Sequence, residues 1–450
     1  MRSVRLNKSS VIRNGVLILL FWLVGLTNPL QAQVILELED AVSIGLENNF
    51  SIRIVENEAR ISDNNNSIGN AGFLPSISAD GSINERVQDN VTVFDNPNIS
   101  DRNDEGAVTT VYDYSVNATW RIFDGLTMFA TLDRLSNEME VSEAQVQLQV
   151  ENVLAAIITG YYEIAGQQKA ADVLNNTVEI SEERIRIAET KRDLGSGSEY
   201  ELLLARADFN ADRTALIRAN TNLNQLKVML TSILGDSVVA DFSVQPEIEL
   251  ADRLNYQNLL NETRRENQEL KIARLNEQVA QAEIREVRGD WMPDIDVSGG
   301  YGYSRTEASS GFSEFSESKG WRYGISASIS LFDGFNKNRR MQNARIRLKN
   351  QELSKRDLEL RITAELSRIY AQYTDAMDLI ELEMENLEIN KETVSIALER
   401  FELGTINSIE LREAQQSLLN AENRLIEAQI AAKSAEIELL RLSGRLLQRN

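Results

Sequence analysis

The sequence predicts a mainly helical protein with a small β part that crosses a membrane. Long segments carry apolar side chains at coiled-coil spacing, and short segments alternate strictly between apolar and polar residues. The same organisation occurs twice along the chain. We therefore expect long antiparallel coiled-coil helices and four β-strands in each chain.

Residues 1–32 have the features of a secretory signal peptide. The first 13 residues include four basic side chains, Val16 to Leu26 is an apolar run, and Ala32 is a suitable last residue before cleavage. The alternative is an uncleaved anchor helix, which is disfavoured because the apolar run is too short to span a bilayer comfortably. We expect the mature protein to leave the cytoplasm, with no acyl anchor because the chain has no Cys.

The composition argues against several classes of function. The 450 residues include no Cys and no His, which removes thiol nucleophiles, thiolate metal sites and the commonest general base. The formal net charge is −22, so phosphate backbones would be repelled and nucleic acid is not expected as a partner. No constellation of Asp and Glu indicates a hydrolase, and we expect no cofactor and no enzymatic activity.

The chain is predicted to consist of two structural repeats, residues 33–246 and 247–450. Phe123-Asp124-Gly125 recurs 209 positions later, as do Leu194-Gly195, Glu201-Leu202 and Gly235. Upstream of the strands the offset is 218, as in Pro75 and Pro293, and a loop accommodates the difference. Chance similarity between helical segments is the alternative, but a constant offset through glycine landmarks disfavours it. Each repeat has the order helix, two strands, very long helix, turn, helix.

The very long helix of the first repeat is expected from about Gly125 to Asp193. Its apolar residues recur at gaps of three, four or seven, and a helix of this length spans about 100 Å. The segment from Leu194 to Ser198 interrupts it, and a second helix is expected to run to about Leu234. Leu403-Gly404-Thr405 makes the same break in the second repeat, where Gly suits a helix end with positive φ.

Four segments of roughly 9–12 residues alternate as strands that cross a membrane do. An antiparallel sheet on a soluble core alternates identically, so the membrane interpretation depends also on the signal peptide and the long helices. Aromatic residues near the strand ends suit the lipid–water boundary, and the polar face would line a wet lumen. The residues expected to face lipid are Tyr112, Tyr114, Val116 and Trp120 in the first repeat, and Tyr323, Ile325 and Ile329 in the second.

Four strands are too few to close a membrane barrel, and an open sheet edge is not viable in lipid. Either the strands lie outside a membrane or several chains build one barrel. Two chains supply eight strands, which leave little lumen. Three chains supply twelve strands, which leave room for a channel.

The duplicated plan, the strand pairs before Phe-Asp-Gly and the motif from Arg400 to Thr405 together resemble the TolC-like outer-membrane factor family. The resemblance covers essentially the whole mature chain. It implies a homotrimer in the outer membrane of a Gram-negative bacterium, with a twelve-stranded barrel and a helical barrel through the periplasm. It also implies a passive exit duct for efflux or type I secretion, docked to a periplasmic adaptor (membrane fusion protein) and an inner-membrane pump.

The resemblance also identifies candidate site residues. Glu410 and Glu413 match the family's acidic pair, and three chains would bring six carboxylates to one constriction that favours cations; by spacing alone they fit a solvated helix face. At the gate, the family's Tyr and Arg are replaced by Phe401 and Ile406. Neither can bond an acidic partner at Glu201 as the family's lock does, so a closed state must be held differently.

The tips of the two helical hairpins are the expected adaptor contacts. The residues concerned are Leu194, Gly195, Leu403 and Gly404. As an alternative, they are simply turns that end helices. For the whole chain, the competing interpretation is a secreted or periplasmic coiled-coil scaffold or adaptor without a pore, which does not explain four alternating strands in two matched pairs.

Overall fold

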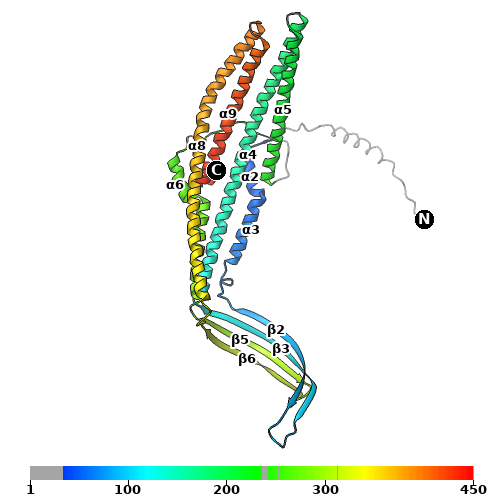
Figure 1. Ribbon diagram of the computed structural model, residues 1–450, viewed down its shortest axis with the longest axis vertical. Coiled ribbons are helices and arrows are strands. Elements are labelled where there is room, and N and C mark those ends of the chain that lie inside the picture. The colour runs from blue at the N-terminus through cyan, green and yellow to red at the C-terminus, as the bar shows by residue number, and fades with distance from the viewer. Residues whose placement is uncertain (1–33, 236–241, 251–252, 312, 449–450) are drawn as a thin grey trace, which may run out of the picture.

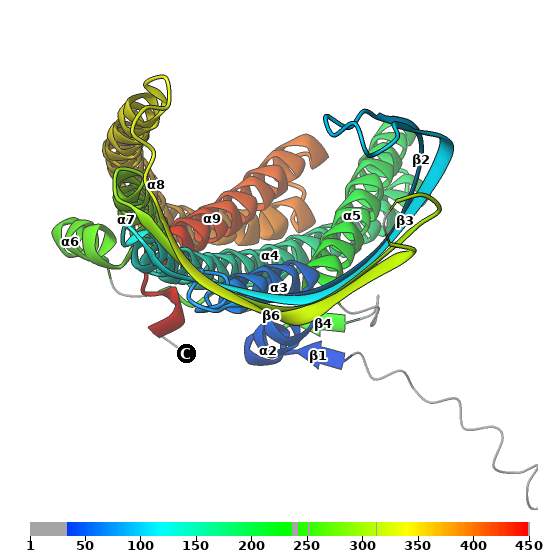
Figure 2. The ribbon, with the colours of Figure 1, turned by 90° about the horizontal axis from the view of Figure 1, so that it is seen from below.

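The computed structural model consists of long helices at one end and a four-stranded sheet at the other (Figure 1). It describes residues 34–235, 242–250, 253–311 and 313–448. The predicted signal peptide, 1–32, lies outside the described residues. Seen along the long axis, helices and strands together form a curved wall (Figure 2). The expected mainly helical fold with a small β part is confirmed.

Each half of the chain contributes a pair of long strands and a long helical hairpin. The helices are α2 (Leu38–Asn48), α3 (Phe50–Asn65), α4 (Thr127–Asp193), α5 (Glu199–Leu234), α6 (Tyr256–Glu266), α7 (Gln268–Gly289), α8 (Asn336–Glu402) and α9 (Ser408–Leu442), followed by the 3₁₀ turn η1 (Leu446–Gln448). The strands are β1 (Val34–Leu36), β2 (Ser76–Thr92), β3 (Arg102–Asp124), β4 (Phe242–Val244), β5 (Asp294–Ala308) and β6 (Phe315–Ser328).

The helices lie side by side in a row that has a free edge on each side. Near the tips, α4 packs between α5 and α9, and α9 packs between α4 and α8. Nearer the sheet, α4 packs between α3 and α7, and α7 packs also against α8. Thus α3 and α5 form one edge of the wall, and α8 forms the other.

The repeated Phe-Asp-Gly sequence makes the junction between sheet and helix. Gly125 and Leu126 both have positive φ, which turns the chain sharply out of β3 into α4. The Asp124 carboxylate accepts a hydrogen bond from the Met128 N–H at 2.9 Å, which occupies one of the donors that a helix start leaves free. Asp333, Gly334 and Phe335 do the same before α8, with Lys337 as the donor.

The helix expected before the strands is in fact two helices, broken at one asparagine. The Asn49 side chain accepts from the N–H groups of Ser51 and Ile52 and caps α3. Its amide also donates to the Ile233 carbonyl at the end of α5. Asn267 repeats this between α6 and α7, with Leu442 as the acceptor at 3.1 Å. The sequence pattern alone did not indicate these two breaks.

Equivalent tyrosines bind the start of each repeat to its long helix. The Tyr161 hydroxyl donates to the Leu36 carbonyl, and the Tyr370 hydroxyl donates to the Leu254 carbonyl, both at 3.1 Å. The donors are 209 residues apart and the acceptors 218, the two offsets found in the sequence. These contacts support the division into repeats 33–246 and 247–450, which we propose.

The buried core lies midway along the wall. One cluster joins α2, α4, α5 and β4 around Ile157 and Leu230, and a second joins α6, α8 and α9 around Tyr373 and Leu439. Across the parts of the chain described, no helix combines the length and apolar character needed to cross a membrane.

Candidate functional site

The four long strands form one antiparallel sheet in the order β2-β3-β5-β6, and its register gathers the apolar residues on one face. Val116 pairs with Ala79 on one side and with Tyr301 on the other, and Tyr301 pairs with Trp321. Neighbouring rows place Tyr112, Tyr114, Trp120, Tyr323 and Ile325 on this same face. Many of these side chains are exposed in the described structure, and Tyr323 is 90% exposed.

Two expectations about the strands were wrong. The strands have 14 to 23 residues instead of the expected 9–12, because pairing continues outward through polar residues such as Glu85 and Thr110. Ile329 does not lie in a strand, since β6 ends at Ser328, which pairs with Asp294. The residue just before β5 is Pro293, which has no N–H with which to continue the hydrogen-bond ladder to β6.

The opposite face of the sheet is polar and carries its own bonds. Asn117 donates to the Asp80 carboxylate and to Ser115, and Arg121 forms an ion pair with Asp296 at 3.0 Å. A Cβ at Gly300 would lie 2.6 Å from the Asn117 side-chain oxygen. Small residues on β5 therefore leave room for longer polar side chains on β3.

The outer edges of this sheet, β2 and β6, have no partner strand among the described residues. Along the chain, β2 follows α3, and β6 leads into α8. Both edges therefore present unpaired backbone N–H and C=O groups along the strands.

The hairpin tips lie at the end of the molecule opposite the sheet (Figure 1). Leu194 and Leu403 are 78% and 72% exposed, although both are large apolar residues. Gly195 and Gly404 follow them with φ of 75° and 72°, which ends each helix. The geometry is that of exposed, apolar-tipped turns.

Glu201 and Glu410 occupy equivalent positions and make equivalent bonds. Each is the third residue of its helix and completes a capping box, Glu201 with Ser198 and Glu410 with Asn407. Glu413 is exposed one turn further along α9. Glu201 and Glu410 line one groove between the two hairpins, and Ile406 lines it too.

Phe401 is buried in that groove and joins the two hairpins. Its ring lies under the Lys191 ammonium, 4.0 Å from the centroid, and its carbonyl accepts from Lys191 at 3.4 Å. The aromatic residue at this position thus binds a cation of the neighbouring hairpin in the same chain, without needing a hydroxyl group.

A buried polar cluster two to three turns from the tips was missed by the sequence analysis. Arg412 of α9 makes two hydrogen bonds to the Asp212 carboxylate of α5, at 2.6 and 2.7 Å, and Ser181 donates to the same carboxylate. Arg184 of α4 is 3% exposed and binds Asp208 at 3.1 Å. This cluster bridges the two hairpins of one chain.

Burial and charge act on the pKa values of this cluster in opposite directions. The hydrogen bond to Asp212 raises the pKa of Arg412, whereas desolvation lowers the pKa of Arg184. The sequence offered one signal, because the apolar series of the long helix steps from Val178 to Ile185 and omits Ser181. Period alone does not distinguish such a gap from a solvated position.

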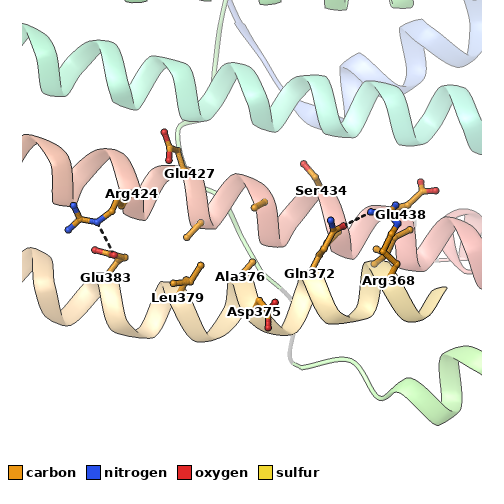
Figure 3. Close-up of a pocket in the computed structure, with 14 residues that line it drawn as sticks. Arg368, Gln372, Asp375, Ala376, Leu379, Glu383, Arg424, Glu427, Ser434 and Glu438 are labelled. Atoms are coloured by element: carbon orange, nitrogen blue, oxygen red, sulfur yellow. Dashed lines mark hydrogen bonds and ion pairs between the residues drawn. The ribbon is translucent and has the colours of Figure 1, made fainter. Parts of the chain in front are cut away.

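A second groove lies between α8 and α9 (Figure 3). The ion pair between Glu383 and Arg424 lies towards one end of it, at 2.9 Å, and Arg368 lies towards the other. Its floor includes Ala376 and the half-exposed Leu379. Within the described ranges, no group of three or more Asp or Glu residues is arranged to hold a metal ion.

The buried cluster predicts the effect of Arg412→Leu. The substitution leaves the Asp212 carboxylate buried with only Ser181 as a donor, so we expect a loss of about 3 kcal/mol in local stability. Hydrogen exchange should then accelerate in residues 181–212. Arg213→Leu, an exposed cation beside Asp212, is the control and should leave exchange unchanged. The double variant Asp212→Ala/Arg412→Leu should recover protection; equal exchange in all variants would contradict this role.

Comparisons with known proteins agree with this geometry. A family model of outer membrane efflux proteins matches residues 41–236 and 259–445. Protein CyaE of Bordetella pertussis is 25% identical over 339 residues, which cover 74% of this chain and 70% of that protein.

Solved outer-membrane channels have the same fold. The CmeC channel of Campylobacter jejuni superposes with a TM-score of 0.77 at 16% identity, covering 91% of this chain and 85% of that one. VceC of Vibrio cholerae gives 0.73 at 15%, covering 90% and 96%. MtrE of Neisseria gonorrhoeae gives 0.72 at 15%, covering 91% and 89%. This chain belongs to the outer membrane efflux protein family, and it is an outer-membrane channel of a Gram-negative bacterium with a long periplasmic helical part.

Proposed function

We propose that three copies of the chain assemble into one continuous tube, which serves as the exit duct of an efflux or type I secretion machine. The observation that carries this proposal is that both layers end in unlike edges: the sheet in β2 and β6, and the row of helices in α3 and α5 on one side and α8 on the other. Joining unlike edges of successive copies generates a ring when the rotation closes. Three copies supply twelve strands, enough for a membrane barrel with a lumen.

The two repeats predict how neighbouring copies meet. Within one chain, α4 of the first repeat packs against α9 of the second. The equivalent pair is α8 of one copy and α5 of the next. Leu154 of α4 is buried against Ile437 of α9, whereas its equivalent Thr363 lacks such a partner. Ile437 is 3% exposed, whereas its equivalent on α5, Val228, is 62% exposed.

The same asymmetry recurs about three turns earlier in these helices. Ile426 is 8% exposed because it lies against α4 near Gly166, but its equivalent Ile217 is 59% exposed. Apolar side chains of α5 are thus exposed at the positions where the equivalent side chains of α9 are covered by α4. The α8 helix of a neighbouring copy would bury these side chains of α5. The groove between α8 and α9 (Figure 3) lies on the edge that would receive them.

An engineered disulfide tests the assembly. A Cβ on Gly166 would lie 2.8 Å from Cγ1 of Ile430. The Cβ of Ile430 is one bond beyond Cγ1, so the two Cβ atoms fall within the disulfide range of about 3.5–4.5 Å. The equivalent pair between copies is Asp375 and Thr221. The double variant Thr221→Cys/Asp375→Cys should therefore form covalent trimers on oxidation, seen on non-reducing gels, because the natural chain has no Cys.

Each single variant is the matched control. A lone cysteine at Thr221 or Asp375 does not meet its own copy across a threefold axis, so it should give no covalent trimer. The double variant could instead stay monomeric after oxidation while being extracted from outer membranes in normal amount. That result would contradict the proposed contact between α5 and α8.

We further propose that the apolar face of the sheet contacts lipid and that the polar face lines the lumen. Ile325 and Ser326 are neighbours on opposite faces of β6, so they form a matched pair. Ile325→Asp would place a carboxylate in lipid and reduce the yield of folded protein in outer membranes, whereas Ser326→Asp would place it in water. Immunoblots of washed outer membranes measure both, and equal yields would reverse or abolish the face assignment.

The duct itself would be passive, because a pump in the inner membrane would supply the energy for export. We propose the exposed hairpin tips, Leu194-Gly195 and Leu403-Gly404, as contacts for a periplasmic adaptor. Apolar residues at exposed turns are typical of surfaces that a partner covers. If the tips were only turns that end helices, the exposed leucine at each tip would have no role.

At the tip end, we propose that Glu410 and Glu413 of three copies form an acidic ring that favours cations. Glu410→Gln/Glu413→Gln removes up to six charges and keeps the capping box, which accepts Gln as well as Glu. Single-channel recordings should show lower cation selectivity and weaker block by trivalent cations. Glu399→Gln/Glu402→Gln, with the same spacing before the turn, is the control. Unchanged selectivity in the first variant would leave the pair as a solvated helix face.

A further inference from the structure

Lys319, on the apolar face of the sheet, forms no ion pair with a described residue, although Glu317 lies one row outward on the same face. The row containing it crosses all four strands as Gly81, Tyr114, Tyr303 and Lys319. Lys319 is exposed and makes no hydrogen bond or ion pair with any described residue. The next cation outward is Arg305, which is already neutralised by Glu307 at 2.6 Å and stacks on Phe315.

Lys319 lies close to the outer boundary of the apolar band. From Ile295, the first residue of the band on β5, to Arg305 a strand tilted as in membrane barrels rises about 26 Å. That matches the height of a typical apolar band, about 25 Å, so Arg305 marks its limit. Lys319 is one row inside, at about 5 Å, where a lysine reaches the boundary by extending its stem. The side is outer because the β2–β3 and β5–β6 turns lie opposite the periplasmic helices (Figure 1).

Exposed aromatic rings surround this ammonium group. Tyr301 and Trp321 meet edge to face at 5.2 Å in the row below, and Tyr114 stacks with Tyr303 at 6.3 Å in its own row. Trp321 is 77% exposed, and its indole N–H has no acceptor in the described chain. A cation beside flat rings that carry N–H and O–H groups has the chemistry to bind a phosphorylated sugar, with the phosphate on the cation.

We propose that Lys319, together with Tyr303 and Trp321, binds the phosphate of a phosphorylated glycolipid in the outer leaflet of the outer membrane. The lipid chains lie along the apolar face below, and the sugar rests on the aromatic rings. The site fixes the height of the barrel in the membrane, because the charge pair sits at one row of the sheet. The proposal rests on the lipid-facing assignment of this face.

The test uses detergent-purified full-length protein and native mass spectrometry with lipid A, the phosphorylated glycolipid anchor of this leaflet. Wild-type protein should bind phosphorylated lipid A about tenfold more tightly than its dephosphorylated form, and Lys319→Gln should abolish the difference. Lys319→Arg should restore most of it. Inorganic phosphate should not compete at equal concentration, since the lipid's apolar contacts contribute; if it competes fully, the site is one for free phosphate.

Arg322→Gln is the matched control. Arg322 lies on the same strand and is equally exposed, but it belongs to the polar face opposite Gly300. Its replacement should leave lipid binding unchanged. Equal weakening by Arg322→Gln, or wild-type binding by Lys319→Gln, would overturn the site. The comparison of Ile325→Asp with Ser326→Asp reports separately on the face, so a failed lipid site with a correct face remains distinguishable from a wrong face.

Discussion

The unpaired backbone at the two sheet edges is the constraint on which the rest of the molecule depends. Strands β2 and β6 each leave a row of N–H and C=O groups without partners in the described chain, and lipid offers them none. Because the chain is an outer-membrane protein, we propose that other copies of the same sheet pair with these groups. The row of helices also ends in two unlike edges, α3 and α5 on one side and α8 on the other, so we propose that one assembly completes both layers.

The alternating strands and the long helices could be predicted because each follows a single period over many residues. Val116 and Trp120 share a face for that reason, and Asp193 ends α4 where the break was expected. The strand ends could not be predicted, since pairing beyond the apolar band depends on partner strands and not on apolarity. Ile329 was misassigned because its alternation continues after Pro293 has ended the ladder on β5.

Long-range polar contacts escaped the sequence analysis for a related reason. The break at Asn267 depends on a carbonyl 175 residues away, and the Arg412–Asp212 pair joins two hairpins across 200 residues. Local spacing carries no trace of such partners. For Glu201 and Glu410 the outcome was the opposite, because their equivalent positions were identified from the sequence. Their local capping bonds explain why an acidic residue occurs at each position.

The hairpins of one chain are joined by the ion pair of Arg412 with Asp212 and by the hydrogen bond from Arg184 to the Ser408 carbonyl, but the equivalent positions of the two arginines, Leu203 and Thr393, carry no charge. In the proposed assembly, contacts between copies would therefore depend mainly on apolar burial and strand pairing. The most direct measurement of the central claim is the mass of the complex extracted in mild detergent, corrected for bound detergent. The account predicts three chains per complex; a monodisperse single chain that stays soluble after detergent removal would contradict it.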